Sequence, residues 1–234
     1  MFIEKDHIYH IYNQGNNRQQ IFFNRENYLY FLRKMKEYIL PYGDIMAWCL
    51  MPNHFHWMVY VRETTFVVSN EGVAKASATH GVTLSHPVSK IKGITKATDG
   101  VTLSHPVSKI NKTRSFNDSI GILLRSYTRA VNKQETNSGA LFREATKAEC
   151  LTAINGITPS FYITEYGTII DVPDPEKEYP QICFNYIHNN PVKAGLVNSA
   201  EDWEFSSYQD ICGIRNGKLI NRDRINEFGL TFSI

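Results

Sequence analysis

Hydrophobic and polar residues alternate over residues 8–13, which predicts a β-strand. Hydrophobic residues then recur at helical spacing between Asn24, which can cap the start of a helix, and Pro41, which would end it. Two hydrophobic segments follow, at residues 43–50 and 54–62, and a short Met-Pro-Asn turn joins them. This half of the chain therefore predicts the order strand, helix, strand, strand, with a hairpin after the helix.

The second half of the chain contains an amphipathic helix that also carries a basic row. The apolar face that predicts this helix consists of Ile120, Leu123, Leu124, Tyr127 and Val131. Arg125, Arg129 and Lys133 recur every four residues, so they form one row on the helix surface. Such a row is either a solvated surface or a set of phosphate contacts, and the sequence leaves both interpretations open.

Further elements are predicted towards the C-terminus. Residues 139–150 contain another strand, and residues 182–187 predict a helix. Pro191 would interrupt that helix, because proline lacks the N–H group and its ring crowds the preceding turn. Between these elements, residues 159–178 are rich in loop-forming residues, and we expect an insertion there.

A longer insertion is expected at residues 64–112, which are rich in Ser, Thr, Gly, Val and Lys and have little periodicity. The sequence GVTLSHPVSKI occurs twice within it, at residues 81–91 and 100–110. Two copies of so short a repeat cannot build a solenoid with its own core. The pattern therefore predicts a single domain of 234 residues with a duplicated surface insertion.

Composition narrows the function classes only slightly. Hydrophobic residues make up 42% of the chain, enough for a sizeable core, and the net charge of +2 does not by itself indicate nucleic-acid binding. No run of 18 apolar residues predicts a transmembrane helix, and the N-terminus has no signal-peptide pattern. The four cysteines are scattered without a CxxC pair, so we expect a cytoplasmic protein with free thiols.

Candidate chemistry begins with His54 and His56, which are separated by one residue in a predicted strand. Side chains alternate faces along a strand, so both imidazoles point the same way and can bind one metal ion. Two separately hydrogen-bonded histidines remain the alternative. A structural zinc site would need four ligands, commonly including cysteine, so the pattern favours an open site that solvent or substrate completes.

A nucleophile and a third ligand are available in the segment FNYIHNNPVKAGLV. In a helix, Tyr186 and Asn190 lie four residues apart on one face, so the phenol can approach a phosphate while the amide oxygen faces a metal. Asn190 has a competing interpretation as the cap of a new helical turn that starts at Pro191. Most tyrosines are core residues, and Tyr127, on an apolar helix face, is the alternative nucleophile.

Four motifs occur in a fixed order and resemble one known family. They are YHIYNQGNNRQQIF, CLMPNHFHWMVYV, GALF and YIHNNPVKAGLV. This set is similar to the motifs of the REP-associated tyrosine transposases, which belong to the HUH single-strand endonucleases. The resemblance covers residues 7–62, 117–150 and 180–210, and leaves out both predicted insertions.

The resemblance implies a fold, a reaction and a set of site residues. The fold would be an α+β, ferredoxin-like antiparallel sheet with the HUH strand at its centre. His54 and His56 would bind the metal with Asn190 as third ligand, and Tyr186 would form a 5′-phosphotyrosine link and release a 3′-hydroxyl. The partner would be single-stranded or hairpin DNA, and the protein a monomer or a homodimer. An amide oxygen ligand without a thiolate favours Mg²⁺ or Mn²⁺ over Zn²⁺.

DNA contacts are expected from two places in the chain. The polar loop with Asn16, Asn17 and Arg18 lies where the family reads bases beside the cleavage site, and such side chains can reach the exposed edges of unpaired bases. The row of Arg125, Arg129 and Lys133 would contact phosphates. The chain departs from the family at residues 143–148, where REATKA replaces a GRYK-like segment, which weakens the expectation of DNA contacts there.

Two other functions remain open. A ferredoxin-like sheet could bind single-stranded nucleic acid without cleaving it, as a regulator, and Tyr186 would then lie out of reach of the histidines. A metal-dependent hydrolase that activates water would need an Asp or Glu base, and none neighbours His54 and His56 in the sequence.

Overall fold

A four-stranded antiparallel sheet forms the centre of the computed structural model, which describes residues 2–68, 112–152, 162–164, 167–169 and 175–232. Its elements follow the chain order β1 (Ile8–Gln14), α1 (Arg25–Tyr38), β2 (Gly43–Met51), β3 (His54–Val61), α2 (Phe116–Glu135) and β6 (Lys147–Cys150). The strands lie in the order β2-β3-β1-β6, which is the ferredoxin-like arrangement. The predicted fold is therefore confirmed, including the central position of the strand that carries His54 and His56.

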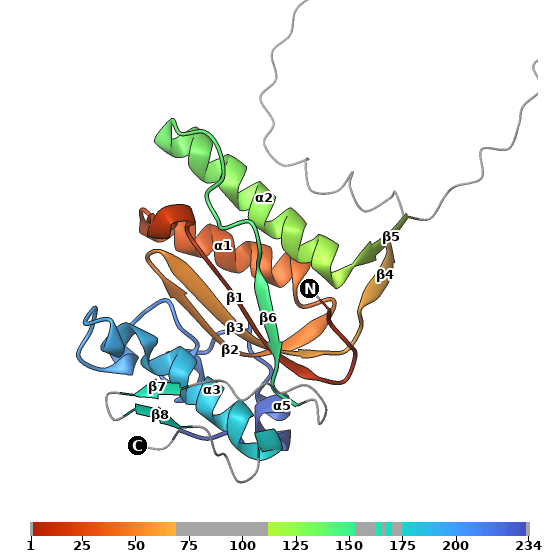
Figure 1. Cartoon of the computed structure of the whole chain (residues 1–234), viewed down its shortest axis with the longest axis vertical. Coiled ribbons are helices and arrows are strands. Elements are labelled where there is room, and N and C mark those ends of the chain that lie inside the picture. Colours follow the sequence, from red (N-terminus) through yellow and green to blue (C-terminus); the bar gives the residue numbers. More distant parts are fainter. Residues whose placement is uncertain (1, 69–111, 153–161, 165–166, 170–174, 233–234) are drawn as a thin grey trace, which may run out of the picture. The chain divides into compact units, whose positions relative to one another are not determined.

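Helices α1 and α2 cover one face of this sheet (Figure 1). Asn24 caps α1 by accepting a hydrogen bond from the Asn27 backbone N–H, and Ser115 caps α2 in the same way through Asp118. Phe55 and Trp57 of β3 point into this layer and are fully buried. Because side chains alternate along a strand, the histidines of β3 face the other side of the sheet.

That other face is covered by α3 (Pro175–Lys193) and C-terminal residues (Figure 1). The predicted interruption at Pro191 is wrong, because α3 continues through Pro180 and Pro191 and ends at Lys193. Pro191 lies in the last turn, where only one helical hydrogen bond is lost and burial of its ring compensates. Asn190 is thus an interior helical residue and does not cap a new turn.

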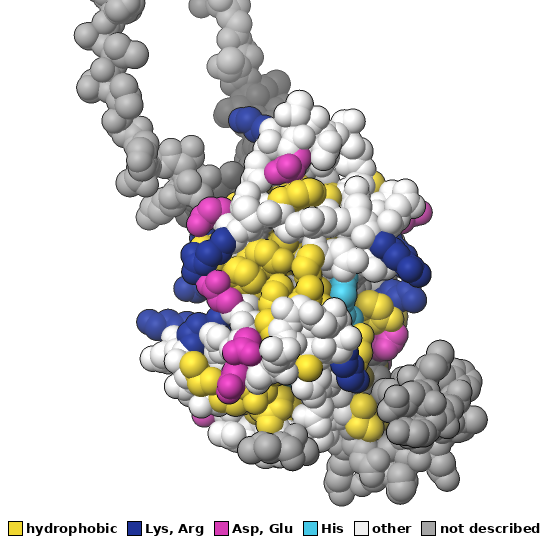
Figure 2. All heavy atoms as spheres, turned by 90° about the vertical axis from the view of Figure 1, so that its left-hand side faces the viewer, with side chains coloured by type: hydrophobic (Ala, Val, Ile, Leu, Met, Phe, Trp, Pro, Cys, Tyr) yellow, Lys and Arg dark blue, Asp and Glu magenta, His cyan; other side chains and the backbone are white. Residues whose placement is uncertain are grey.

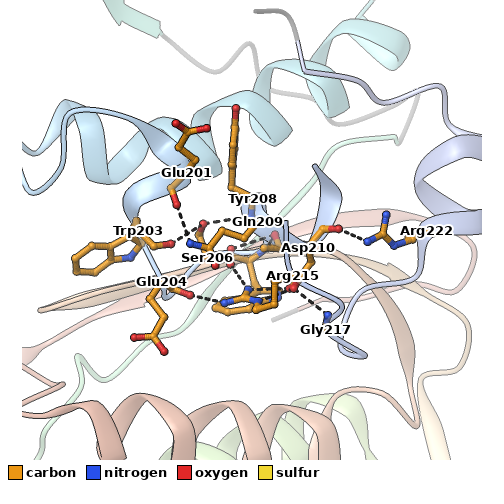
Figure 3. A network of polar contacts seen from close by, with 12 residues as sticks. Glu201, Trp203, Glu204, Ser206, Tyr208, Gln209, Asp210, Arg215, Gly217 and Arg222 are labelled. Carbon is orange, nitrogen blue, oxygen red and sulfur yellow. Dashed lines mark hydrogen bonds and ion pairs between the residues drawn. The ribbon is translucent and has the colours of Figure 1, made fainter. Parts of the chain in front are cut away.

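The outer edge of β2 is covered by the C-terminal segment, which includes η3 (Ala200–Asp202), α4 (Tyr208–Ile211) and α5 (Arg222–Glu227). The Leu50 N–H donates to Phe205 O at 2.8 Å, and the Ser207 N–H donates to Trp48 O at 2.9 Å. Arg215 holds the segment in place, because it binds both carboxylate oxygens of buried Asp210 at 2.6 and 2.8 Å (Figure 3). Its guanidinium also lies over the ring of Trp48 in β2. An otherwise open sheet edge is thereby closed.

Replacing Asp210 should destabilise the fold strongly, because it leaves the Arg215 guanidinium without its carboxylate partner. Breaking a buried pair costs about 3–5 kcal/mol, and Arg215 is partly exposed, so we expect Asp210→Asn to lower the free energy of unfolding by about 2–3 kcal/mol. The matched control is Glu204→Gln, which breaks the exposed pair with Arg25 and should cost less than about 1 kcal/mol. Urea denaturation measures both, and equal losses would contradict this account.

Short strands accompany the two predicted insertions. β4 (Thr65–Val68) pairs with β5 (Lys112–Ser115), and β7 (Tyr162–Thr164) pairs with β8 (Gly167–Ile169). The chain divides into two compact units, one of residues 1–66 with 115–234 and one of residues 67–114. Both copies of GVTLSHPVSKI lie outside the described residues. Helix α3 already begins at Pro175, inside the second predicted insertion.

In the part of the chain that the structure describes, no helix has the length and apolar character needed to cross a membrane.

Candidate active site

Strands β1, β3 and β6 and helix α3 bring polar side chains to one cavity of about 220 Å³ on the α3 side of the sheet. His54 and His56 come from β3, and Tyr186 comes from α3. The remaining lining residues are Tyr12, Asn13, Gln14, Arg143, Ala145 and Lys147. In the view of Figure 2, histidine side chains reach the surface at one small spot beside hydrophobic side chains. The sequence prediction that both histidines and Tyr186 meet is therefore matched by the geometry.

Hydrogen bonds fix one ring nitrogen of each histidine. His54 Nδ1 lies 2.6 Å from Asn53 Oδ1, and His56 Nδ1 lies 2.9 Å from His10 Nε2. Burial lowers the pKa of both imidazoles, that of His56 strongly, with the neighbouring His10 and His54 adding to it. Both rings are therefore neutral near pH 7. Neutral imidazole is the form that binds metal ions.

The residues present fit the metal that the resemblance implies. Nε2 of His56 is buried and has no hydrogen-bond partner among the described residues, and its other nitrogen is held by His10. Metal-binding histidines are commonly held in this way through the second nitrogen. Within the described residues no three His, Cys, Asp or Glu side chains are grouped as a metal site, so His54 and His56 have no third ligand of these four types. The side chain of Asn190 contacts His54, because it raises the pKa of that imidazole against the larger effect of burial.

Tyr186 lines the cavity beside the two histidines. Its ring lies 5.3 Å from that of His56, and 38% of the residue is exposed. Burial raises the pKa of the phenol, whereas Asn190 lowers it. Lys193 Nζ lies 5.8 Å from the ring centroid, within cation–π range.

Two other tyrosines near the sheet, Tyr127 and Tyr12, donate their hydroxyls in structural hydrogen bonds. Tyr127 is fully buried on the opposite face and donates its hydroxyl to Ile21 O at 2.7 Å, which confirms its role in the core. Tyr12 lines the cavity but donates its hydroxyl to Glu149 Oε1 at 2.6 Å, and burial and Glu149 raise the pKa of its phenol.

Several residues around the cavity were missed by sequence reasoning. His10 and Glu149 lie behind His56, while Arg143 and Lys147 line the cavity itself. The segment REATKA, where the departure from the family pattern weakened the expectation of DNA contacts, thus places two cationic side chains at the cavity. His10 carried a usable signal, because it shares a strand face with Tyr12 in the predicted alternation. Glu149 carried no such signal, because it reaches His10 only through the register in which β6 pairs with β1.

The predicted base-reading loop lies next to the turn before His54. Asn16, Asn17 and Arg18 form the short helix η1 and are exposed. Gly15 N–H donates to Asn53 O at 2.8 Å, and a Cβ on Gly15 would lie 2.1 Å from Gln19 O, so only glycine fits this turn. The structure therefore brings the loop beside the histidines.

The basic row on α2 is only partly at the site. Arg125 and Arg129 line a second cavity of about 360 Å³, which shares Asn13 and Arg143 with the first cavity. Lys133 lies one turn further along and lines neither of these two cavities. Of the three predicted phosphate contacts, the structure groups Arg125 and Arg129 and leaves Lys133 apart.

His188 anchors α3 and so sets the position of Tyr186. It is fully buried, Nδ1 donates to Phe184 O at 2.7 Å, and Nε2 lies 2.7 Å from Ser207 Oγ. Ser207 in turn bonds the backbone of Trp48 in β2. The chain of contacts fixes the rotation of the helix against the sheet.

Stability should depend on pH through His188. Burial lowers its pKa to about 3, whereas an unfolded histidine titrates near 6.5. Below about pH 6.5 this histidine binds a proton in the unfolded chain but stays neutral in the folded chain. The free energy of unfolding therefore decreases by about 1.4 kcal/mol per pH unit as the pH falls from about 6.5 to about 3. His188→Gln should remove this part of the slope in urea denaturation between pH 4 and 7. An unchanged slope would show that His188 is not responsible.

Comparisons with known proteins place these observations in context. No family model matches the chain, and no curated protein sequence matches it. A comparison of solved structures finds a REP-associated tyrosine transposase bound to a REP hairpin. The chain is similar to this transposase. The two share 14% sequence identity with a TM-score of 0.48, over 94% of this chain and 92% of the transposase.

Proposed function

We propose that this protein is a tyrosine transposase-like nuclease that cuts and rejoins single-stranded DNA at hairpin-forming sequences. The observation that carries the proposal is the convergence of His54, His56 and Tyr186 at one cavity on the α3 side of the sheet. The Asn190 side chain is hydrogen-bonded to both His54 and Tyr186. The four motifs of the sequence support the same reaction class. Neither insertion contributes a residue to this constellation.

In the proposed reaction the Tyr186 hydroxyl loses its proton and its oxygen attacks a backbone phosphorus. A bond forms between the tyrosine oxygen and phosphorus, the bond to the 3′ oxygen breaks, and that oxygen takes up a proton. The product is a 5′-phosphotyrosine and a free 3′-hydroxyl, which can reverse the step and rejoin DNA. A bound divalent ion, Mg²⁺ or Mn²⁺, would supply the charge that polarises the phosphoryl group.

The residues of this chain would hold the phosphate and favour the attack. His54 and His56 would bind the ion with Asn190 as the third protein ligand, and the positive charges of Arg143 and Lys147 in the cavity would attract the DNA backbone. The Lys193 ammonium lies within cation–π range of the Tyr186 ring, and burial raises the pKa of that phenol. Glu149 does not line the cavity, which argues against a hydrolase that activates water with a carboxylate.

The test is to incubate the protein with single-stranded hairpin DNA, with Mg²⁺, Mn²⁺ or EDTA. We expect a covalent protein–DNA adduct that requires the metal and leaves a 3′-hydroxyl on the released strand. Tight binding without any adduct would instead support a non-catalytic regulator. Hydrolysis without an adduct would support the hydrolase.

Single-stranded DNA would leave the cleavage cavity towards Arg125 and Arg129, because the two cavities share Asn13 and Arg143. Each phosphate contact contributes about 0.7 to the slope of log binding constant against log salt for single strands. Arg125→Ala with Arg129→Ala should therefore weaken binding and reduce the slope by about 1.4. Lys133→Ala, from the same helix but outside both cavities, is the matched control. A slope equal to wild type in the double variant would exclude this path.

A further inference from the structure

Behind His56 lies a second histidine that the proposed reaction does not use. His10 Nε2 lies 2.9 Å from His56 Nδ1, and the two rings stack with centroids 5.1 Å apart. Both residues are buried. Because both rings are buried on the same face of adjacent strands, their hydrogen bond has a fixed geometry, and one nitrogen must donate while the other accepts.

Glu149 lies on the far side of His10 from His56. Its Oε2 lies 3.9 Å from His10 Nδ1, an electrostatic contact, and its Oε1 accepts the Tyr12 hydroxyl at 2.6 Å. His10 and Tyr12 hold the pKa of Glu149 below its usual value, so the carboxylate is charged at neutral pH. A negative charge on that side favours a proton on His10 Nδ1. His10 Nε2 is then an acceptor, and His56 Nδ1 must donate to it.

We propose that Glu149 and His10 are positioning residues that hold His56 in the tautomer with a lone pair on Nε2. That nitrogen is buried and has no hydrogen-bond partner among the described residues. The inference rests on the proposed metal-binding role of His56, since a protonated Nε2 could not bind a metal. The ring of His54 is held differently, by a hydrogen bond to the side chain of Asn53.

The pairing of the strands explains how three separate segments build this relay, the chain of contacts from Glu149 through His10 to His56. Glu149 of β6 is opposite His10 of β1, and Tyr12 of β1 is opposite His56 of β3. All four side chains therefore project from the same face of three neighbouring strands. Edge strand β6 thus contributes to the site through its register, although Glu149 does not line the cavity.

The first measurement reads the tautomer directly in the metal-free protein. Long-range ¹H–¹⁵N NMR spectra of the histidine side chains, assigned with His10→Gln and His54→Ala variants, should show His56 protonated at Nδ1 in the wild type. Glu149→Gln should shift His56 and His10 towards a mixture of tautomers. Glu144→Gln, an exposed residue with the same change of charge, is the matched control and should leave the spectrum unchanged.

The second measurement is Mn²⁺ affinity, followed by electron paramagnetic resonance without DNA. Loss of an outer partner of a metal-binding histidine weakens binding by about 10–100-fold, which we expect for Glu149→Gln but not for Glu144→Gln. Tyr12→Phe keeps the Glu149 carboxylate but removes its hydrogen bond, so Mn²⁺ affinity should decrease by a smaller factor. This variant takes the place of Glu149→Gln if Glu149→Gln does not fold.

Two results would overturn the relay: His56 protonated at Nε2 in the wild type, or a Glu149→Gln variant with wild-type tautomer and Mn²⁺ affinity. A wild-type protein that binds no Mn²⁺ but has the expected tautomer, lost in Glu149→Gln, would contradict the proposed function and leave the relay standing. The two failures are therefore distinguishable.

Discussion

His54→Ala combined with His56→Gln should reduce formation of the covalent DNA adduct by about 10³-fold or more. A bound metal contributes several kcal/mol of charge stabilisation at the phosphoryl group, and each 1.4 kcal/mol is a factor of ten in rate. Both side chains line the cavity that holds Tyr186, and both rings are neutral at pH 7. The rate of adduct formation on a labelled hairpin, with Mn²⁺ and with EDTA, measures the effect.

The control for this variant is His7→Ala. His7 precedes β1 and bonds Thr152 at 3.1 Å, away from the cavity lining. The His7→Ala variant should form the covalent DNA adduct at the wild-type rate. Circular dichroism should show that the double variant remains folded, since Gln at position 56 retains a polar group for His10. A folded double variant that cuts at the wild-type rate would exclude a catalytic metal at these histidines.

Tyr186→Phe should abolish the adduct completely, because the substitution removes the attacking oxygen. It retains the ring that packs near His10 and His56, and Tyr186 is 38% exposed, so stability should change by less than about 0.5 kcal/mol. DNA binding and Mn²⁺ binding should remain at wild-type levels. Gel electrophoresis under denaturing conditions detects the adduct, and fluorescence anisotropy measures the binding.

Two matched variants separate this effect from a general loss of tyrosine hydroxyls. Tyr127→Phe removes a buried hydrogen bond to Ile21 and should cost about 1 kcal/mol of stability while the adduct still forms. Tyr12→Phe tests the second tyrosine of the cavity, and it should also retain adduct formation. An adduct in Tyr186→Phe that disappears in Tyr12→Phe would transfer the nucleophile to Tyr12.

The sequence predicted the parts of the site that depend on local periodicity. Alternation along residues 54–61 placed His54 and His56 on the face opposite Phe55 and Trp57, and helical spacing placed Tyr186 and Asn190 on one face. Both periods are properties of the backbone, so they hold whatever the element packs against.

The missing parts depend on how distant segments pair. Glu149 reaches His10 only because β6 aligns with β1 in one register, and no local pattern encodes that register. The continuation of α3 through Pro191 depends in the same way on packing, since burial of the ring outweighs the lost hydrogen bond. The positions of Arg143 and Lys147 at the cavity became apparent only in the structure, because three strands and a helix build that cavity together.

Peptide mapping of the trapped adduct tests the central claim most directly. The wild-type protein is reacted with hairpin DNA and Mn²⁺, the DNA and protein are digested, and the nucleotide-bearing peptide is sequenced by mass spectrometry. We expect a single modified peptide with the phosphodiester on Tyr186. A phosphodiester on Tyr12, on Tyr127 or on any residue other than Tyr186 would contradict the assignment, and complete cleavage of the DNA without a modified peptide would contradict the proposed mechanism.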